Sequence, residues 1–329
     1  MIQERIRWID VYKGIAIVLV VVGHCPISEP CYKFIYSFHL LAFFFISGYT
    51  FKLHKDEPFG KFVNKKAKRL LIPYFFFGTM WMFTSWTIQY VHHTFDSSIN
   101  SILYDIYCLL TASGYHDISG PAWFLFALFT ASLLFYAVCY VYECYPKFAM
   151  GGVIVSFAIG YYLSGKAYAP FQITQALTVI PVMLMGYSLK RIGLPELNRL
   201  QSLFLCLIGF VMVWFLSQYD RPVNLVSNTL MGNPLLFIAC GALGIVSLIL
   251  LSKNIFGLAS RIFMFFGVES MTLMGIHQEI RSMSNLLANS FFELSRMQLL
   301  VVNLLSVFIL SVPIIWLLNT YFPKLTGKR

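Results

Sequence analysis

The chain has 329 residues, of which 58% are hydrophobic and 12% are charged, and its mean hydropathy is +0.72. Soluble domains usually carry about a quarter of charged residues, so this composition excludes an ordinary soluble protein. The net charge is +10. We expect no nucleic-acid partner, because binding one needs a folded basic surface with interleaved aromatic residues outside the apolar segments.

The first apolar run, residues 14–23, follows a charged start and allows two interpretations. It is either a secretory signal or the first of several membrane spans. A signal peptide needs a small-residue cleavage site after its apolar core, and residues 20–30 offer none. We therefore expect the segment to stay in the protein as a span, with His24 near its outer end.

About 20 apolar residues cross the ~30 Å hydrocarbon core as a helix. Ten segments have this character, near residues 9–27, 33–53, 70–91, 120–142, 147–164, 171–190, 201–218, 232–252, 264–288 and 298–319. Lipid cannot satisfy exposed peptide groups, and the alternating segments of a β-barrel are absent. The sequence predicts an all-α, polytopic integral membrane protein with about ten transmembrane helices, in a single domain over residues 1–329.

The basic residues lie unevenly along this topology. Most of the 24 lysines and arginines fall on one side, in residues 1–13, 52–69, 190–199 and 324–329. The positive-inside rule then places the N- and C-termini in the cytoplasm, in a multi-pass protein of the inner (plasma) membrane. The two longest connections are 54–69, expected on the cytoplasmic side, and 92–119, expected outside.

The seven cysteines lie mostly inside the apolar segments and show neither a CxxC pair nor metal-ligand spacing. We expect no metal site. Cys25 and Cys31 both fall at the outer end of the first hairpin, where they either form a disulfide or remain apolar packing groups.

Ionisable residues within a span are costly and are functional candidates. Lys13 and His24 are 11 positions apart, so on a helix they share one face about 16 Å apart, and Asp10 lies on that face too. The alternative is structural: the histidine makes an interhelical hydrogen bond and the lysine reaches toward the membrane surface.

Two further spans carry a histidine. The second span has His39 near its outer end and Ser47 in its other half, and the ninth has His277 with Arg281 one turn on. Three such histidines together favour a shared polar cavity over three separate packing roles.

Five stretches resemble, in chain order, motifs of the membrane acyltransferase 3 family: WIDVYKGIAIVLVVVGH, SFHLLAFFFISGY, KRLLIPYFF, AWFLFALF and ESMTLMGIHQ. The first is similar to the family pattern of a basic residue, ten positions and a histidine, with Lys13 where arginine is usual. The second resembles the motif of the bacterial sugar and polysaccharide O-acetyltransferases, the fucose 4-O-acetylase-like branch. It has Leu40 and Leu41 where that branch often has Met-Pro.

This resemblance implies ten transmembrane helices and transfer of an acyl group, commonly acetyl from acetyl-CoA. The acceptor would be a hydroxyl or amine of a sugar or lipid-linked glycan. It also implies that His24 is the essential imidazole and that Lys13 replaces the essential arginine. Acetyl-CoA would act as the donor substrate, with no permanently bound cofactor.

The chemistry agrees with these roles. Forming an ester from a thioester requires a base for the attacking hydroxyl, and a positioned histidine is the usual one. An acyl-histidine intermediate is the alternative, and the sequence does not separate the two. We expect His24, Lys13, Asp10 and His39 to be catalytic, and the candidates for donors to the developing oxyanion to include Ser47 and Trp123.

The remaining site residues are assigned to binding. The basic segment 52–69 either holds the phosphates of coenzyme A, chiefly through Lys68 and Arg69, or only orients the protein against anionic lipid. Lys13 and Ser47 are further donor-binding candidates, and Trp123, His277 and Arg281 are candidates for the acceptor. The connection 92–119 either binds the glycan or forms a solvated lid, through His92, His93, Asp96, Asp105, His116 and Asp117.

Two other classes of protein were considered. A multi-span transporter would use the buried histidines to relay protons, but transporters usually show duplicated halves, and no such repeat is present. A membrane anchor or sensor would not explain three buried histidines. The sequence therefore favours a membrane O-acyltransferase.

Overall fold

The computed structural model describes residues 6–113, 118–166 and 169–328. Their regular structure is helical, with short 3-10 turns between some of the α-helices. Within these residues the β structure is an isolated bridge between Asn224 and Thr229. The predicted all-α class is confirmed.

The chain forms two compact units, each built from two stretches of sequence. The first contains Met1–Lys52 and Val179–Ser270, and the second contains Leu53–Thr178 and Met271–Arg329. Because both units are discontinuous, neither is a separate sequence domain, and a single domain over residues 1–329 stays a prediction.

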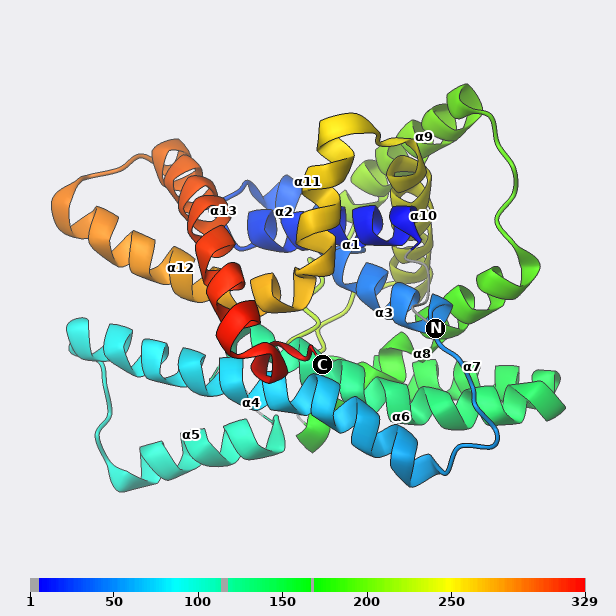
Figure 1. Cartoon of the computed structure of the whole chain (residues 1–329), viewed down its shortest axis with the longest axis horizontal. Helices are drawn as coiled ribbons and strands as arrows, with labels where there is room; N and C mark the ends of the chain where they lie inside the picture. The colour runs from blue at the N-terminus through cyan, green and yellow to red at the C-terminus, as the bar shows by residue number, and fades with distance from the viewer. Residues whose placement is uncertain (1–5, 114–117, 167–168, 329) are drawn as a thin grey trace. The chain divides into compact units, whose positions relative to one another are not determined.

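The first unit is organised around its first helix. Its helices are α1 (Arg7–Gly23), α2 (Glu29–Tyr36), α3 (His39–Tyr49), the later part of α8 (Ile173–Ile192), α9 (Arg199–Gln218), α10 (Pro234–Asn254) and α11 (Gly257–Val268). Helix α1 packs against α2, α3, α10 and α11. In Figure 1, α11 (yellow) lies across α1 (blue).

Glycines allow α1 and α11 to approach closely. A Cβ atom on Gly14 of α1 would overlap the carbonyl group of Phe263, and one on Gly267 of α11 would overlap the carbonyl of Asp10. Small residues at such crossings let helix backbones meet within a membrane. The turn of α1 that carries Asp10 is therefore covered by the backbone of α11.

Arg7 fixes the beginning of α1. Its Nε donates to the hydroxyl of Ser260 at 3.1 Å, and its Nη2 donates to the carbonyl of Ile255 at 3.0 Å. Its guanidinium also lies 5.0 Å from the ring centroid of Phe256. Hydrogen bonds and the packed ring thus hold the start of α1 to the segment between α10 and α11.

The second unit contains the longest helix. Its elements are α4 (Phe59–Val91), α5 (Ile99–Thr111), η1 (Gly120–Ala122), α6 (Trp123–Cys144), α7 (Pro146–Tyr162), η2 (Pro170–Gln172), the start of α8, α12 (Ser270–Phe291), α13 (Arg296–Tyr321) and η3 (Pro323–Thr326). Helix α4 packs against α5, α6, η1 and η3, and Figure 1 shows it alongside α6.

Capping side chains explain where several helices begin. The side chain of Asn198 accepts from the backbone N–H of Gln201, whose side chain bonds back to Asn198, and this capping box opens α9. Ser295 and Gln298 form the same arrangement at the start of α13. Each box satisfies two backbone donors that a helix end leaves unpaired.

Six helical stretches among the described residues are long and apolar enough to cross a membrane, and a seventh results if α11 and α12 count as one span. The chain is thus an integral multi-pass membrane protein. The other expected spans fall in α1 and α7, which have 17 residues each, and in α4. The number ten and the cytoplasmic termini stay predictions.

Two expected spans are broken helices. The segment 33–53 contains the end of α2 and all of α3, with Ser37 and Phe38 between them. The segment 264–288 contains the end of α11 and most of α12, with the break at Glu269. Neither break contains a proline, so the sequence gives no warning of it.

The two long connections are also partly helical. Helix α4 already begins at Phe59, because lysine and arginine are good helix formers, so the basic residues of 59–69 lie on a helix and not in a loop. With 33 residues α4 is about 50 Å long, more than the hydrocarbon core needs. Residues 99–111 of the expected external loop form α5.

We predict that Gly267→Ala destabilises the protein, because the added Cβ has to push the α1 backbone away. Overpacking of this kind costs on the order of 1–3 kcal/mol. The matched control is Gly151→Ala, since a Cβ at that helical glycine meets nothing within 4 Å. Thermal unfolding in detergent should show a lower midpoint for the first variant only. Equal midpoints would contradict the close crossing.

Candidate active site

Asp10 and Lys13 form an ion pair on α1. The Lys13 ammonium lies 2.7 Å from a carboxylate oxygen of Asp10, across one helical turn. The Asp10 side chain is 9% exposed and that of Lys13 is 25% exposed. The structure therefore brings these two predicted residues together, in the turn of α1 that Gly267 covers.

His24 directly follows α1 and caps its end. Its Nδ1 lies 2.8 Å from the carbonyl oxygen of Val20. A carbonyl oxygen only accepts hydrogen bonds, so Nδ1 carries the hydrogen and Nε2 carries the lone pair. The thiol of Cys25 donates to the next carbonyl, that of Val21, at 3.3 Å. The end of α1 thus fixes the tautomer in which Nε2 is the basic nitrogen.

His39 has the same arrangement at the break between α2 and α3. It is the first residue of α3, it is fully buried, and its Nδ1 donates to the carbonyl of Ile35 at 2.8 Å. Ser37 donates to the carbonyl of Phe34 at 2.7 Å, so two side chains satisfy the end of α2. The Nε2 atom of His39 is buried without a hydrogen-bond partner.

Tyr36 lies between the two histidines. Its ring centroid is 6.3 Å from that of His24 and 4.7 Å from that of His39, which meets it edge to face. Its hydroxyl donates to the carbonyl of Gly23 at 3.4 Å, and a Cβ on Gly23 would come within 2.9 Å of the ring. Both histidine rings therefore lie close to the same tyrosine ring. Tyr36 thus links the end of α1 to the start of α3.

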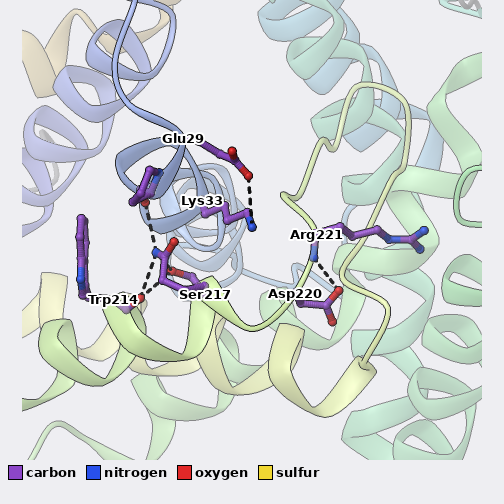
Figure 2. A network of polar contacts seen from close by, with 8 residues as sticks. Glu29, Lys33, Trp214, Ser217, Asp220 and Arg221 are labelled. Carbon is purple, nitrogen blue, oxygen red and sulfur yellow. Dashed lines mark hydrogen bonds and ion pairs between the residues drawn. The ribbon is translucent and has the colours of Figure 1, made fainter.

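Helix α2, which carries Tyr36, is attached to the end of α9. Figure 2 shows the ion pair between Glu29 and Lys33 on α2, at 3.3 Å. The amide of Gln218 on α9 donates to the carbonyl of Pro30 at 3.2 Å. One turn before Tyr36, the ring of Tyr32 stacks on it with centroids 3.8 Å apart. These contacts hold α2 in place beside the histidines.

The segment after α9 is organised by Asp220 (Figure 2). Its carboxylate accepts backbone N–H groups of Arg221 at 2.7 Å, Gly232 at 2.9 Å and Asn233 at 2.8 Å. Burial alone would raise the pKa of Asp220, but these hydrogen bonds and the Arg221 charge outweigh it and lower the pKa. The carboxylate thereby closes the connection between α9 and α10.

Lys68 and Arg69 are exposed on the first part of α4, in the second unit. Burial, and then the charges of Arg69 and Lys65, lower the pKa of half-buried Lys66 to about 8. The ion pairs of Lys13, Lys33 and Lys61 involve none of the cations of 65–69. Within the described part of the chain, these cations are crowded together without carboxylate partners.

His277 and Arg281 also belong to the second unit. His277 is 1% exposed on α12, and its Nδ1 donates to the carbonyl of Met274 at 2.8 Å. It therefore has the same tautomer as the other two histidines. Because His277 lies in the other unit, the shared cavity of three histidines stays a prediction.

Trp123 belongs to the second unit, and Ser47 lies on α3 of the first unit. Trp123 is buried at the start of α6, in the second unit, where its ring meets Phe124 edge to face. Ser47 is half-buried on α3, about two turns beyond His39, and its carbonyl accepts from the Thr50 hydroxyl at 3.5 Å. Their oxyanion and substrate roles stay predictions.

The acidic residues of the expected external loop have structural partners. Asp96 accepts from the backbone N–H of Ser98 at 2.9 Å, and Asp105 accepts from the indole of Trp86 at 2.8 Å, which ties α5 to α4. His116 and Asp117 lie outside the described residues. Cys25 and Cys31 are not joined by a disulfide, so that alternative is not realised. Within the described part of the chain, no three His, Cys, Asp or Glu side chains gather as metal ligands.

The profile of a family described as an acyltransferase domain matches residues 6–320. The chain belongs to the acyltransferase 3 family. It is therefore a membrane-bound acyltransferase, and the predicted family and class of reaction are confirmed, without a branch of the family. No match was found among curated proteins or among solved structures.

For this acyltransferase, sequence analysis missed Tyr36 and Ser37. A tyrosine is not conspicuous in a chain with 17% aromatic residues, and Ser37 precedes a break that the sequence does not mark. The only sequence signal is their position two and three residues before His39.

We predict that Tyr36→Leu lowers acyl-transfer turnover about tenfold, because the ring that orients His24 and His39 is lost. Tyr36→Phe keeps the ring and should retain most of the turnover, with an altered pH profile. Tyr140→Leu, at an exposed position of α6, serves as the control. Unchanged turnover in Tyr36→Leu, or an equal loss in the control, would contradict the positioning role.

Proposed function

We propose that this acyltransferase moves an acyl group, most simply acetyl, from acyl-CoA to a hydroxyl group of a cell-envelope or exopolysaccharide glycan. The observation that carries the proposal is the fixed tautomer of His24. The Nδ1 atom of His24 is held by the Val20 carbonyl, which leaves Nε2 as the basic nitrogen. The chain belongs to a family of acyltransferases, in which a base of this kind is useful.

In the proposed reaction, Nε2 of His24 takes the proton of the acceptor hydroxyl as the oxygen attacks the thioester carbon. The tetrahedral intermediate collapses, the carbon–sulfur bond breaks, and the thiolate of CoA leaves. The imidazolium returns its proton to the departing sulfur, so the atoms balance without another reactant. General base catalysis of this kind contributes about 10²–10⁴-fold to the rate. Attack by Nε2 itself, forming an acyl-histidine, remains the alternative mechanism.

Helix ends favour His24 over His39 as the base. His24 follows the C-terminal end of α1, where the partial negative charge of the helix stabilises an imidazolium. His39 opens α3, and the N-terminal end of a helix is positive. The rings of both histidines lie close to the ring of Tyr36, and like charges near one another repel, so one imidazolium at this place is favoured over two. We assign His39 to holding and orienting Tyr36 and the reacting groups.

The donor would bind through basic groups. The cations of 65–69 have no carboxylate partner among the residues that the structure describes, and Lys68 and Arg69 are exposed, which suits the phosphates of acyl-CoA. The positive-inside rule would place this part of α4 on the cytoplasmic side. Lys13, held by Asp10, and Ser47 are the other two residues that we assign to the donor.

The acceptor side is proposed from the resemblance to the sugar O-acetyltransferases. Trp123, His277 and Arg281 are assigned to the glycan, and the protein to the plasma membrane. A proton-relaying transporter is the competing function, since it too would use buried histidines. It differs in one observable respect: a transporter does not release CoA when an acceptor is added.

We predict that His24→Gln reduces acetyl transfer at least a hundredfold, because the base is removed. The assay incubates purified protein with labelled acetyl-CoA and a panel of p-nitrophenyl glycosides, and follows acceptor-dependent release of CoA. The matched control is His54→Gln, at an exposed histidine outside the helices. Near-normal turnover in a well-folded His24→Gln would exclude the proposed base. Absence of CoA release from the wild type with every acceptor would favour the transporter.

We predict that Lys13→Met raises the KM for acetyl-CoA about tenfold, while Lys13→Arg retains most activity because arginine keeps the charge. Removing one partner of a buried pair typically costs about 3–5 kcal/mol, so Lys13→Met also threatens folding. The double variant Asp10→Asn with Lys13→Met removes both charges and should fold, yet stay impaired. A double variant with normal KM would leave Lys13 a structural role only.

A further inference from the structure

Helix α12 is unusually polar for a buried membrane helix. Every residue from Thr272 to Ile280 is buried, and these include His277, Gln278 and Glu279. A helix that is enclosed on all sides in a membrane protein is expected to be apolar, unless its polar groups have hydrogen-bond or charge partners in the protein or in a ligand. The packing of α12 on α4 is tight, since a Cβ at Gly275 would overlap the Phe77 ring.

Several polar atoms of α12 are buried without a partner. Within the described part of the chain, Oε1 of Gln278, Oδ1 of Asn285 and the two carboxyl oxygens of Glu279 have no hydrogen-bond partner. Gln278 is 6% exposed and Glu279 is 9% exposed. Unpaired polar atoms cost free energy at such depth, and lipid cannot compensate them. A bound molecule with hydrogen-bonding groups would remove this cost.

Gln278, Arg281 and Asn285 form one stripe. Spacings of three and four residues place side chains on the same face of a helix, within about 60° of one another. The stripe therefore alternates an amide, a guanidinium and an amide over about two turns, roughly 10 Å. This length suits a single sugar ring with its substituents.

We propose that the stripe Gln278–Arg281–Asn285 binds the hydroxyl groups of the acyl acceptor, a polyhydroxylated sugar. This inference rests on the proposed function and names two residues, Gln278 and Asn285, in addition to Arg281. The unpaired oxygens are hydrogen-bond acceptors, so the ligand has to donate. Sugar hydroxyls donate and also accept from the guanidinium, whereas the phosphates of CoA have almost no hydrogen to donate at neutral pH.

α12 itself supplies the matched control. Asn289 lies one turn beyond Asn285 and is exposed. It therefore has the same side chain on the same helix, but its amide oxygen is not buried. Replacing each asparagine by leucine changes the same atoms at the two positions. If leucine only disturbs the structure of α12, both variants will show the effect. If Asn285 belongs to a sugar subsite, only Asn285→Leu will show weaker binding.

The experiment compares wild type, Gln278→Met, Asn285→Leu and Asn289→Leu. Loss of one such hydrogen bond should raise the KM for the best p-nitrophenyl glycoside about tenfold, with the KM for acetyl-CoA unchanged. Asn289→Leu should match the wild type. Thermal unfolding with the same glycosides gives a second readout: at least one should raise the midpoint of wild type and Asn289→Leu, and not of the other two.

The outcomes separate this inference from the proposed function. Stabilisation by a glycoside that depends on Gln278 and Asn285, without any transfer to it, would support the sugar subsite and overturn the proposed transfer to a glycan hydroxyl. An increase in the KM for acetyl-CoA instead would assign the stripe to the pantetheine amides and overturn the inference. It would also be overturned if no glycoside shifts the midpoint, or if all three variants respond alike.

Discussion

The rest of the site depends on one constraint, which is that lipid offers no hydrogen bonds to the carbonyl groups at a helix end. In this protein imidazoles meet that need. His24 bonds the Val20 carbonyl and His39 bonds the Ile35 carbonyl, both through Nδ1 at 2.8 Å. Each bond fixes a tautomer and directs the basic character to Nε2. The hydrogen bond that satisfies a carbonyl at the helix end thus also leaves Nε2 as the nitrogen that could accept a proton. A structural role and a chemical role of these histidines are therefore compatible.

A second constraint is the close approach of helix backbones around α1. Gly14 and Gly267 leave room for α11, and Gly23 leaves room for the ring of Tyr36. These glycines bring the ion pair of Asp10 and Lys13 under α11, and the end of α1 against α2. The two contacts thus fix the parts of α1 that carry the candidate donor-binding residue Lys13 and the candidate base His24.

The sequence alone identified candidate residues whose type is rare in a membrane span, and the reason is physical. A charge or an imidazole in an apolar run is conspicuous because its insertion is costly, which identified Lys13, His24, His39 and His277. It did not find Tyr36, whose role comes from its place between two rings. It also could not find the unpaired oxygens of Gln278 and Asn285, since an amide is remarkable only once its partners are known.

The sequence by itself determined the helical membrane class, the family and the histidines, because hydropathy and residue type are local properties. Only the tertiary structure decided where the helices break, at Ser37–Phe38 and at Glu269, and which carbonyl each imidazole meets. It also decided that the basic start of α4 is helical and that α11 covers Asp10. Breaks and crossings depend on contacts between residues far apart in the chain, and no local pattern encodes them.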